Sequence, residues 1–253
     1  MKKTALIGHT GFVGSHLLNQ YPFTTVFNST NIQTIAGQDF DLVVCAGVSA
    51  VKWWANQHPD EDRMKITHLL DQLKTIRTHT FILISTVDVY PSTTDVDETF
   101  DCQKKVNHAY GKNRLHVEDT IRALFPQAII IRLAGLFGHG LKKNVIYDLL
   151  HDNCLEVINP QSVFQWYYLN NLWQDLETVQ SKNIKLVNLV NEPVQTADII
   201  ERFFKNKPVG AQKGTPISYN IRTRYSELLG GKNGYLQDKE TVLTQIGQFI
   251  QRV

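Results

Sequence analysis

The sequence predicts an α/β fold, in which a doubly wound parallel sheet is followed by a small and partly interleaved C-terminal part. Three observations support this prediction. Short apolar runs rich in β-branched residues alternate with amphipathic helical patterns over the first half of the chain. A glycine-rich turn directly follows the first of these runs. From about residue 135 the alternation gives way to shorter, irregular segments. Such alternation implies right-handed crossovers between parallel strands.

Five apolar runs are expected to form buried strands of the sheet. They comprise residues 4–7, 24–27, 42–45, 81–84 and 128–131. Apolar side chains at helical spacing predict helices around Met64–Leu73 and Leu115–Leu124. The stretch from Thr24 to Asp41 is short for a strand and a full crossover helix, so we expect that helix to be reduced or absent. Later strands are expected at 166–169 and 185–190, and later helices at 145–151, 172–179, 195–204 and 238–252.

Length and composition set broad limits on the kind of protein. The chain has 253 residues, 42% of them hydrophobic, and a net charge of +2. It can bury a substantial core, and its charge gives no reason to expect nucleic acid or an anionic membrane as partner. No apolar run approaches the ~20 residues of a membrane span, and the first apolar stretch is too short for a signal peptide. The three cysteines are scattered. We therefore expect a soluble protein of the reducing cytoplasm.

The segment TALIGHTGFVGSHLL places three glycines at three-residue spacing between the first strand and a helix. Glycine lets the backbone turn tightly and approach a pyrophosphate, whose charge then meets the N–H groups of the helix start. This context favours a dinucleotide site over an ordinary strand–turn–helix corner. The residues expected to contact the cofactor here are Gly8, Thr10, Gly11, Phe12, Val13 and Gly14.

The end of the second strand is where dinucleotide sites usually place a carboxylate for the adenosine ribose. Here the chain offers Asn28, Ser29 and Thr30, with neither a carboxylate nor an arginine. Both NAD and NADP are therefore open. Because uncharged donors do not repel a 2′-phosphate, we lean slightly towards NADP. The same residues are equally consistent with an ordinary polar turn.

A tyrosine on the helix after residue 108 and polar residues after the strand 81–84 suggest a proton-transfer site. Tyr110 and Arg114 are four residues apart and share a helix face. A fixed cation beside the phenol, near a positively charged nicotinamide, favours phenolate and brings the pKa towards neutrality. Thr86 would hold the substrate oxygen, because ligands bind at the carboxyl ends of such strands. Alone, each residue also has a structural explanation, as a surface pair or a cap.

Several motifs, taken in order along the chain, resemble the extended short-chain dehydrogenase/reductase family of nucleotide-sugar epimerases, dehydratases and reductases. GHTGFVG resembles its cofactor loop and CAG the turn after a later strand, while STVDVY and YGKNRLHVE resemble its serine/threonine and Tyr-x-x-x-Lys motifs. The resemblance implies further cofactor contacts from Cys45, Ala46 and Gly47. It also implies a nucleotide-sugar substrate, and it makes a homodimer through the two helices around residues 64–73 and 110–124 a further expectation.

The resemblance implies a Rossmann-type NAD(P)-binding domain and a small substrate-binding cap. The first would comprise residues 1–135 and about 162–190, and the second residues 136–161 and 191–253. In the cap, Asn144 matches a family asparagine that hydrogen-bonds a nucleotide diphosphate, and Lys143 adds positive charge. Arg222 would clamp the diphosphate with its bidentate geometry, unless it is simply a surface charge.

Two departures from the family pattern concern the chemistry. Arg114 stands in place of the family's lysine, and the guanidinium keeps the charge in a bulkier, planar form. Val87 and Asp88 stand in place of the Asp–Glu pair of family dehydratases, which argues against a 4,6-dehydratase. Asp88 occupies the position where some relatives keep a second acid or base, and otherwise it is a solvated or helix-capping aspartate.

These observations give three functional hypotheses. The first is an NAD(P)-dependent oxidoreductase or epimerase of a nucleotide-linked sugar, with Thr86, Tyr110, Arg114 and Asp88 in the catalytic site. Tyr110 and Arg114 would also contact the cofactor, and Arg114 would orient its nicotinamide ribose. The second is a cofactor-binding protein without catalysis, a redox sensor or scaffold, which the arginine motivates. The third is a carbonyl reductase for a non-nucleotide substrate. We expect no metal site, because the nine histidines and three cysteines show no ligand spacing.

Overall fold

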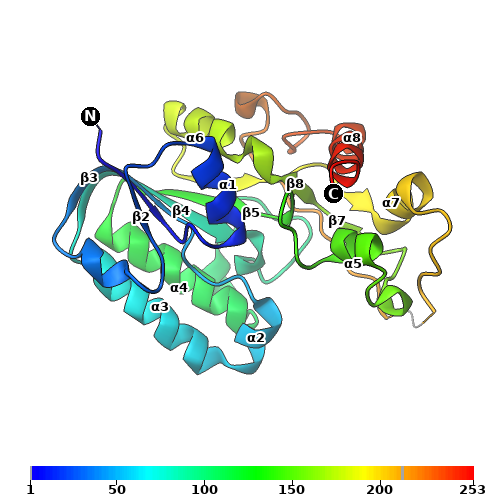
Figure 1. Ribbon diagram of the computed structural model, residues 1–253, viewed down its shortest axis with the longest axis horizontal. Helices are drawn as coiled ribbons and strands as arrows, with labels where there is room; N and C mark the ends of the chain where they lie inside the picture. The colour runs from blue at the N-terminus through cyan, green and yellow to red at the C-terminus, as the bar shows by residue number, and fades with distance from the viewer. Residues whose placement is uncertain (1, 212–213) are drawn as a thin grey trace. The chain divides into compact units, whose positions relative to one another are not determined.

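The computed structural model describes residues 2–211 and 214–253, and it divides into two compact units (Figure 1). Unit 1 comprises Met1–Pro91, Thr99–Arg132 and Leu172–Val187. Unit 2 comprises Ser92–Glu98, Leu133–Asn171 and Asn188–Val253. The division expected from the sequence assigned cofactor binding to one part and substrate binding to the other, and it stays a prediction.

A six-stranded sheet forms the centre of the α/β fold, which confirms the predicted fold class. Its strands follow one another in the order β2-β1-β3-β4-β5-β9. They are β1 (Thr4–Ile7), β2 (Thr25–Phe27), β3 (Asp39–Cys45), β4 (Arg77–Thr86), β5 (Ile129–Leu133) and β9 (Leu186–Leu189). β1 pairs in parallel with β2 and β3, and β3 pairs in parallel with β4. β1 and β5 are buried along their whole length, as the apolar runs predict.

Helices cover both faces of this sheet in unit 1. α1 (Phe12–Gln20) and α6 (Leu172–Ser181) pack together on one face, while α3 (Pro59–Leu73) and α4 (Ala109–Leu124) lie side by side on the other (Figure 1). The short α2 (Lys52–Gln57) precedes α3 and also packs against α4. Between β2 and β3 there is a single turn of 3₁₀-helix, Ile32–Ile35, which confirms that this crossover lacks a full helix.

Unit 2 is built from short elements around its own apolar core. β6 (Gly135–Phe137) pairs with β8 (Trp166–Tyr168), and β7 (Val163–Phe164) pairs with β10 (Val194–Gln195). Its helices are α5 (Val145–His151), α7 (Thr196–Phe203) and α8 (Lys239–Ile250).

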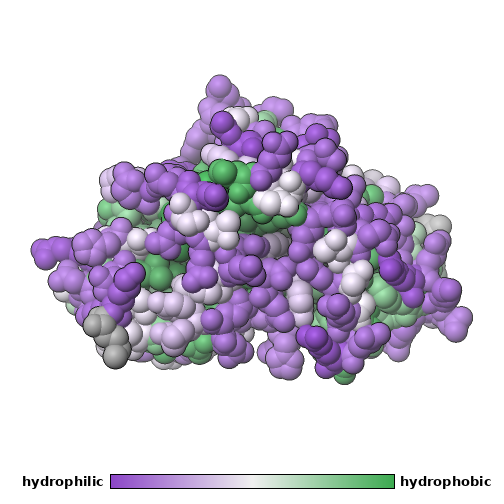
Figure 2. Space-filling model, turned by 90° about the horizontal axis from the view of Figure 1, so that it is seen from above, coloured by the Kyte–Doolittle hydropathy of each residue, from purple (hydrophilic) through white to green (hydrophobic). Residues whose placement is uncertain are grey.

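On the face of the molecule shown in Figure 2, hydrophilic side chains predominate and hydrophobic ones form small patches between them. No helix of the described residues has the length and apolar character needed to cross a membrane.

Candidate functional site

The glycine turn after β1 brings three backbone segments into close contact. Gly8 has a φ of +86°, and a Cβ there would lie 2.5 Å from the carbonyl oxygen of Ala46, in the turn after β3. A Cβ on Gly14 would lie 2.0 Å from the carbonyl oxygen of Gly8. The Gly8 N–H donates to the carbonyl oxygen of Phe27 at 2.7 Å, which ties the turn to the end of β2. Side chains at positions 8 and 14 would therefore push the start of α1 away from the sheet.

The start of α1 fits a pyrophosphate. Gly11 is its N-cap residue with extended backbone, no side chain caps it, and its first turn has no acidic residue. The first N–H groups of a helix lack intrahelical partners and favour an anion. Thr10 is exposed, and Phe12 and Val13 are half-buried beside this helix start. The backbone geometry and the donor groups thus suit the predicted cofactor.

The turn after β3 contributes backbone rather than side chains. Cys45 is buried, and burial raises the pKa of its thiol to about 11. Its side chain therefore belongs to the core. Ala46 and Gly47 are more accessible, and a Cβ on Gly47 would lie 2.9 Å from a side-chain carbon of Ile7. Of the predicted CAG contacts, only the last two residues present accessible atoms.

The turn after β2 is organised by its own side chains. The Asn28 Oδ1 accepts from the Thr30 N–H at 2.9 Å and from the Thr30 hydroxyl at 2.6 Å. The Asn28 N–H donates to Asn31 Oδ1 at 2.7 Å, and Ser29 is exposed. These bonds form the polar turn that the sequence allowed as an alternative. They do not distinguish NAD from NADP, so both cofactors stay open.

Tyr110 and Thr86 converge, although they come from different elements. Tyr110 lies in the first turn of α4, and its phenol is near enough to the Thr86 side chain, at the end of β4, for that hydroxyl to lower the pKa of the phenol. Thr86 Oγ1 also accepts from the Asp88 N–H at 3.1 Å, so it caps the short 3₁₀-helix Val87–Val89. The Tyr110 N–H donates to Asn56 Oδ1 at 2.9 Å, which fixes the start of α4 against α2. The fold thus brings Tyr110 and Thr86 together, and their catalytic roles stay a prediction.

Arg114 stacks on Tyr110, but its charge is paired elsewhere. Its guanidinium carbon lies 4.1 Å from the centre of the Tyr110 ring. Its two terminal nitrogens donate to Asp62 on α3 at 2.5 and 3.0 Å, and one of them also donates to the carbonyl oxygen of Ser49. The Nε is buried without a hydrogen-bond partner among the described residues. Sequence reasoning placed Arg114 beside Tyr110 correctly and missed Asp62.

The surroundings of Tyr110 do not lower its pKa. Burial raises the pKa of the phenol, and the carboxylate of Asp88 adds to the rise, while Arg114 and Thr86 oppose it. The sequence predicted that the arginine, together with a positively charged nicotinamide, would bring the pKa down. Arg114 acts in that direction and is the largest opposing influence, but burial outweighs it, since Tyr110 is only 5% exposed. The protein alone therefore keeps Tyr110 protonated at neutral pH.

Asp88 pairs with Lys52, a residue that sequence reasoning did not single out. Lys52 Nζ lies 2.8 Å from Asp88 Oδ1. Close to this pair, His108 caps α4 by accepting the Gly111 N–H at its Nδ1, at 3.0 Å. Burial lowers the pKa of His108, Lys52 lowers it further, and Asp88 opposes them. Lys52 and Asn56 are four residues apart on α2 and therefore share a helix face. This spacing is the sequence signal that could have identified the face of α2 that meets the site.

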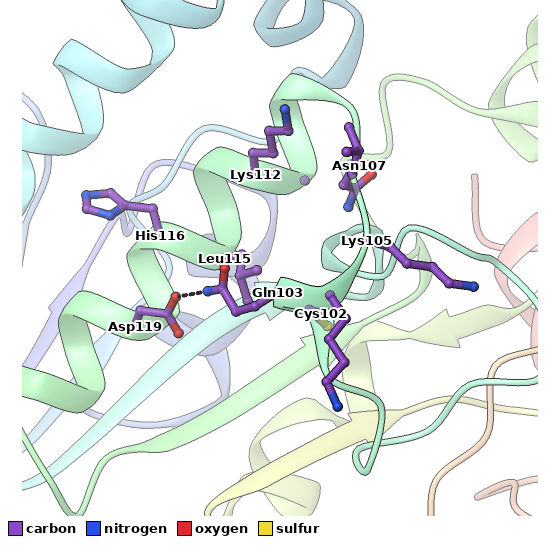
Figure 3. Close-up of a pocket in the computed structure, with 11 residues that line it drawn as sticks. Cys102, Gln103, Lys105, Asn107, Lys112, Leu115, His116 and Asp119 are labelled. Atoms are coloured by element: carbon purple, nitrogen blue, oxygen red, sulfur yellow. Dashed lines mark hydrogen bonds between the residues drawn. The ribbon is translucent and has the colours of Figure 1, made fainter.

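A pocket of about 440 Å³ lies on the other face of α4 (Figure 3). It is lined by Lys105 and Lys112 among others, and their ammonium groups point away from one another. Gln103 Nε2 donates to Asp119 at 2.6 Å across one wall. Lys112 therefore faces away from the Tyr110–Arg114 side, as its position in the sequence predicts.

The predicted substrate residues lie in unit 2. Asn144 caps α5, since its Oδ1 accepts the N–H groups of Ile146 and Tyr147 while its Nδ2 donates to the carbonyl oxygen of Leu136. Lys143 is exposed, and burial of part of its chain lowers the pKa of its ammonium. Arg222 is exposed, with its guanidinium 5.8 Å from the centre of the Tyr235 ring. Asn144 thus has a structural task, whereas Lys143 and Arg222 present accessible cations.

No group of three or more His, Cys, Asp or Glu side chains suited to a metal ion occurs within residues 2–211 and 214–253. The polar groups assembled around Tyr110 are instead hydroxyls, carboxylates and nitrogen cations. Such groups hold oxygen atoms and move protons.

Comparison with known proteins places these features in context. The model of the family described as "NAD dependent epimerase/dehydratase family" matches residues 23–156. UDP-glucuronic acid 4-epimerase from Bacillus cereus is similar in structure, with a TM-score of 0.74, 16% identity and 99% of each chain covered. A dTDP-4-dehydrorhamnose reductase from Clostridium acetobutylicum has a TM-score of 0.74 at 17% identity, over 98% of this chain and 99% of the other. UDP-glucose 4-epimerase from Thermotoga maritima has a TM-score of 0.73 at 12% identity, over 99% of both chains. A search of curated protein sequences finds no match.

Proposed function

The chain belongs to the NAD-dependent epimerase/dehydratase family, and on this premise we propose that it reduces or epimerises a nucleotide-linked sugar with an NAD(P) cofactor. Three structurally similar proteins are epimerases or a reductase of such compounds. The single observation that carries the proposal is that the phenol of Tyr110 and the hydroxyl of Thr86 come together at the carboxyl end of β4.

The cofactor would be held by the glycine turn and the start of α1. Gly8, Gly11 and Gly14 leave room for its pyrophosphate, and the helix N–H groups bind the charge. Ala46 and Gly47 would contribute backbone contacts. The uncharged turn at 28–30 keeps our slight preference for NADP. When bound, the nicotinamide supplies or removes the hydride.

Tyr110 would move the proton at the reacting oxygen. Because its pKa is raised, the residue is a phenol at neutral pH and can donate its proton to a keto oxygen, which suits reduction. Thr86 would hold that oxygen by a second hydrogen bond. An epimerase would use the same pair, with the proton taken and then returned. We propose Asp88 as a second group beside the reacting centre.

Arg114 would support Tyr110 rather than bind the cofactor ribose. Its guanidinium is held by Asp62 and by the Ser49 carbonyl, and it stacks on the phenol ring.

In unit 2, Lys143 and Arg222 would bind the diphosphate of the substrate, with Asn144 ordering the backbone at the start of α5. Because Arg114 forms a buried ion pair with Asp62, it does not replace the family's lysine directly, and this favours the rival hypothesis of a cofactor-binding protein without catalysis.

A panel of keto-sugar nucleotides and NADPH tests the proposal. Steady consumption of NADPH identifies a reductase, and isomer exchange without net consumption identifies an epimerase. Tyr110→Phe should lower kcat by about 10²–10⁴-fold and leave NADPH binding, measured by fluorescence, unchanged. Lys112→Met is the matched control, because Lys112 lies two residues away on the outer face of α4. Tight NADPH binding without turnover of any panel member would support the rival instead.

A further inference from the structure

We propose that Asp62 is a positioning residue of the proton-transfer site, which holds the guanidinium of Arg114 against the ring of Tyr110. This inference rests on the proposed function, because it names a further residue for that site. Asp62 lies outside the motifs that carry the family resemblance. Its carboxylate accepts hydrogen bonds from Arg114 and Asn113, so it would act on the phenol only through Arg114.

The first step is that the Asp62 carboxylate gives the guanidinium a single orientation. Asp62 Oδ2 accepts from Arg114 Nη1 at 2.5 Å, and Oδ1 accepts from Nη2 at 3.0 Å. The two side chains are 2% and 5% exposed. A planar fork that meets a carboxylate through two bonds has a defined plane, and a buried pair cannot separate without leaving a charge unsolvated.

The second step is that the carboxylate is itself held in place on α3. Asn113 Nδ2 donates to Asp62 Oδ2 at 2.8 Å and to the carbonyl oxygen of Pro59, the first residue of α3, at 3.0 Å. The Asp62 N–H donates to the carbonyl oxygen of His58 at 3.0 Å. In this first turn of the helix a negative charge is favourable. The position of the carboxylate is therefore fixed by α3 and by Asn113.

The third step is what the fixed guanidinium faces. The Arg114 Cζ lies 4.1 Å from the centre of the Tyr110 ring. A guanidinium at this distance from an aromatic ring is attracted to its π face, and it stabilises negative charge that develops on the phenol. In agreement, Arg114 is the largest influence that opposes the rise in the pKa of Tyr110. Asp62 thus keeps the cation where it can act on the phenol.

The same bonds bear on the cofactor. Arg114 Nη2 donates to the carbonyl oxygen of Ser49 as well as to Asp62, so the guanidinium is anchored on two sides. It is therefore not free to turn towards a ribose. Loss of Asp62 should then change proton transfer and leave the affinity for NADPH as it is.

The variant Asp62→Asn removes the fork and keeps the size of the side chain. An amide has one acceptor oxygen, so it cannot meet both arms of Arg114, and the guanidinium should leave the ring of Tyr110. We expect kcat to fall roughly tenfold, a fraction of what general acid–base catalysis supplies, with the Kd of NADPH unchanged. Asp60→Asn is the matched control, because Asp60 is an exposed residue of the same helix turn and its loss removes the same charge.

The position of the guanidinium is followed by NMR of the ¹⁵N-labelled protein. In the native protein the guanidinium N–H signals of Arg114, assigned with Arg114→Lys, should be shifted upfield by the Tyr110 ring, and Tyr110→Leu should remove this shift. The two Nη groups should give separate signals, because their exchange by rotation is blocked. In Asp62→Asn the shift should vanish and the Nη signals should merge, as expected for Arg202, whose side chain is 44% exposed.

The phenol is followed separately, with 3-fluorotyrosine at position 110 titrated by ¹⁹F NMR. Its pKa should rise in Asp62→Asn and in Arg114→Gln, because each removes the cation from the ring. The double variant should show no further rise, since Asp62 acts through Arg114. Asp88 and Thr86, which also act on this phenol, are unchanged in these variants. A fall of the pKa in Asp62→Asn would mean that the carboxylate only balances a guanidinium that stays in place, and the inference would be overturned.

The outcomes separate this inference from the proposed function. If no sugar nucleotide is turned over but the Arg114 signals and the phenol titration change as described, the proposed function fails and the positioning by Asp62 stands. If turnover is found and Asp62→Asn matches Asp60→Asn in both measurements, the inference is overturned and the function stands. Should Asp62→Asn not fold, Asp62→Glu replaces it. The longer carboxylate keeps both acceptor oxygens and displaces the guanidinium, so the Nη signals should stay separate while the ring shift changes. An unchanged ring shift in Asp62→Glu would also overturn the inference.

Discussion

Two cation–carboxylate pairs flank Tyr110, and they differ chiefly in burial. The Arg114–Asp62 side chains are 5% and 2% exposed, and those of Lys52–Asp88 are 39% and 17% exposed. The first pair is bidentate and is supported by Asn113 and by the Ser49 carbonyl. In the second, Lys52 Nζ lies 2.8 Å from Asp88 Oδ1, just after the end of β4.

The difference shows how burial divides fixed from responsive charge. In a dry environment, neither member of a pair can lose its partner without leaving a charge unsolvated. The Arg114–Asp62 pair is therefore fixed and holds α3 to α4. In a partly wet environment, a pair contributes little to stability but can respond to a ligand or to pH. Arg114, at the family's motif position, belongs to the buried pair, and the partly exposed pair contains Lys52 from α2.

The largest expected effect comes from breaking the buried pair. Asp62→Ala leaves the Arg114 guanidinium buried without its carboxylate, and we expect the free energy of unfolding to fall by about 3–5 kcal/mol. Urea denaturation measures it. Asp71→Ala is the control on the same helix, since Asp71 pairs with Lys74 on the surface, and it should cost less than about 1 kcal/mol. Equal losses in the two variants would show that burial does not separate the pairs.

A smaller effect is expected when the charge is kept and the fork is lost. Arg114→Lys retains a cation, but a single ammonium cannot meet both Asp62 oxygens and the Ser49 carbonyl in the planar arrangement of the guanidinium. We expect a loss of about 1–3 kcal/mol in unfolding free energy, measured in urea.

Arg202→Lys is the control for that change. Arg202 on α7 pairs with Glu240, with side chains 44% and 73% exposed, and its replacement should cost about 0.5 kcal/mol or less. An Arg114→Lys protein as stable as the native one would contradict the fixed-pair interpretation. If this variant also gained turnover that the native protein lacks, the hypothesis of a binding protein without catalysis would be favoured.

The features that the sequence predicted well are those with a local or periodic cause. The strands of the sheet follow from apolar runs, and the missing helix between β2 and β3 follows from the length of the connecting segment. The convergence of Thr86 and Tyr110 follows from a general rule, because the carboxyl ends of parallel strands and the helices after them meet at one edge.

The ion-pair partners of Arg114 and Asp88 could not be predicted, because no local or periodic pattern determines them. Asp62 is 52 positions from Arg114, and Lys52 is 36 positions from Asp88. Asp62 and Lys52 stand in helix segments that carry other charged residues, and no local pattern identifies the partner of either one. The lowering predicted for the pKa of Tyr110 relied on Arg114 together with a nicotinamide cation, and it stays a prediction. Within the protein, Arg114 lowers this pKa as predicted, and burial, which has no local sequence pattern, outweighs it.

The smallest expected effect concerns the exposed pair and its neighbour His108. Burial and Lys52 lower the pKa of His108 in the folded protein, so the unfolded chain binds more protons as the pH falls. The stability that this group contributes is present above the ordinary histidine pKa of about 6.5 and is lost as the pH falls through the lower, folded value. His108→Ser keeps an N-cap acceptor and removes the titration, so its unfolding free energy should fall less steeply with acid, by less than about 1.4 kcal/mol per pH unit. Urea melts across this range measure the slope.

Lys52→Met should also flatten the pH profile of the unfolding free energy, and Asp88→Asn should steepen it, because the two residues act on the pKa of His108 with opposite signs. Identical profiles in these variants would mean that the exposed pair is as unresponsive as the buried one, and the contrast between the two sides of Tyr110 would be lost.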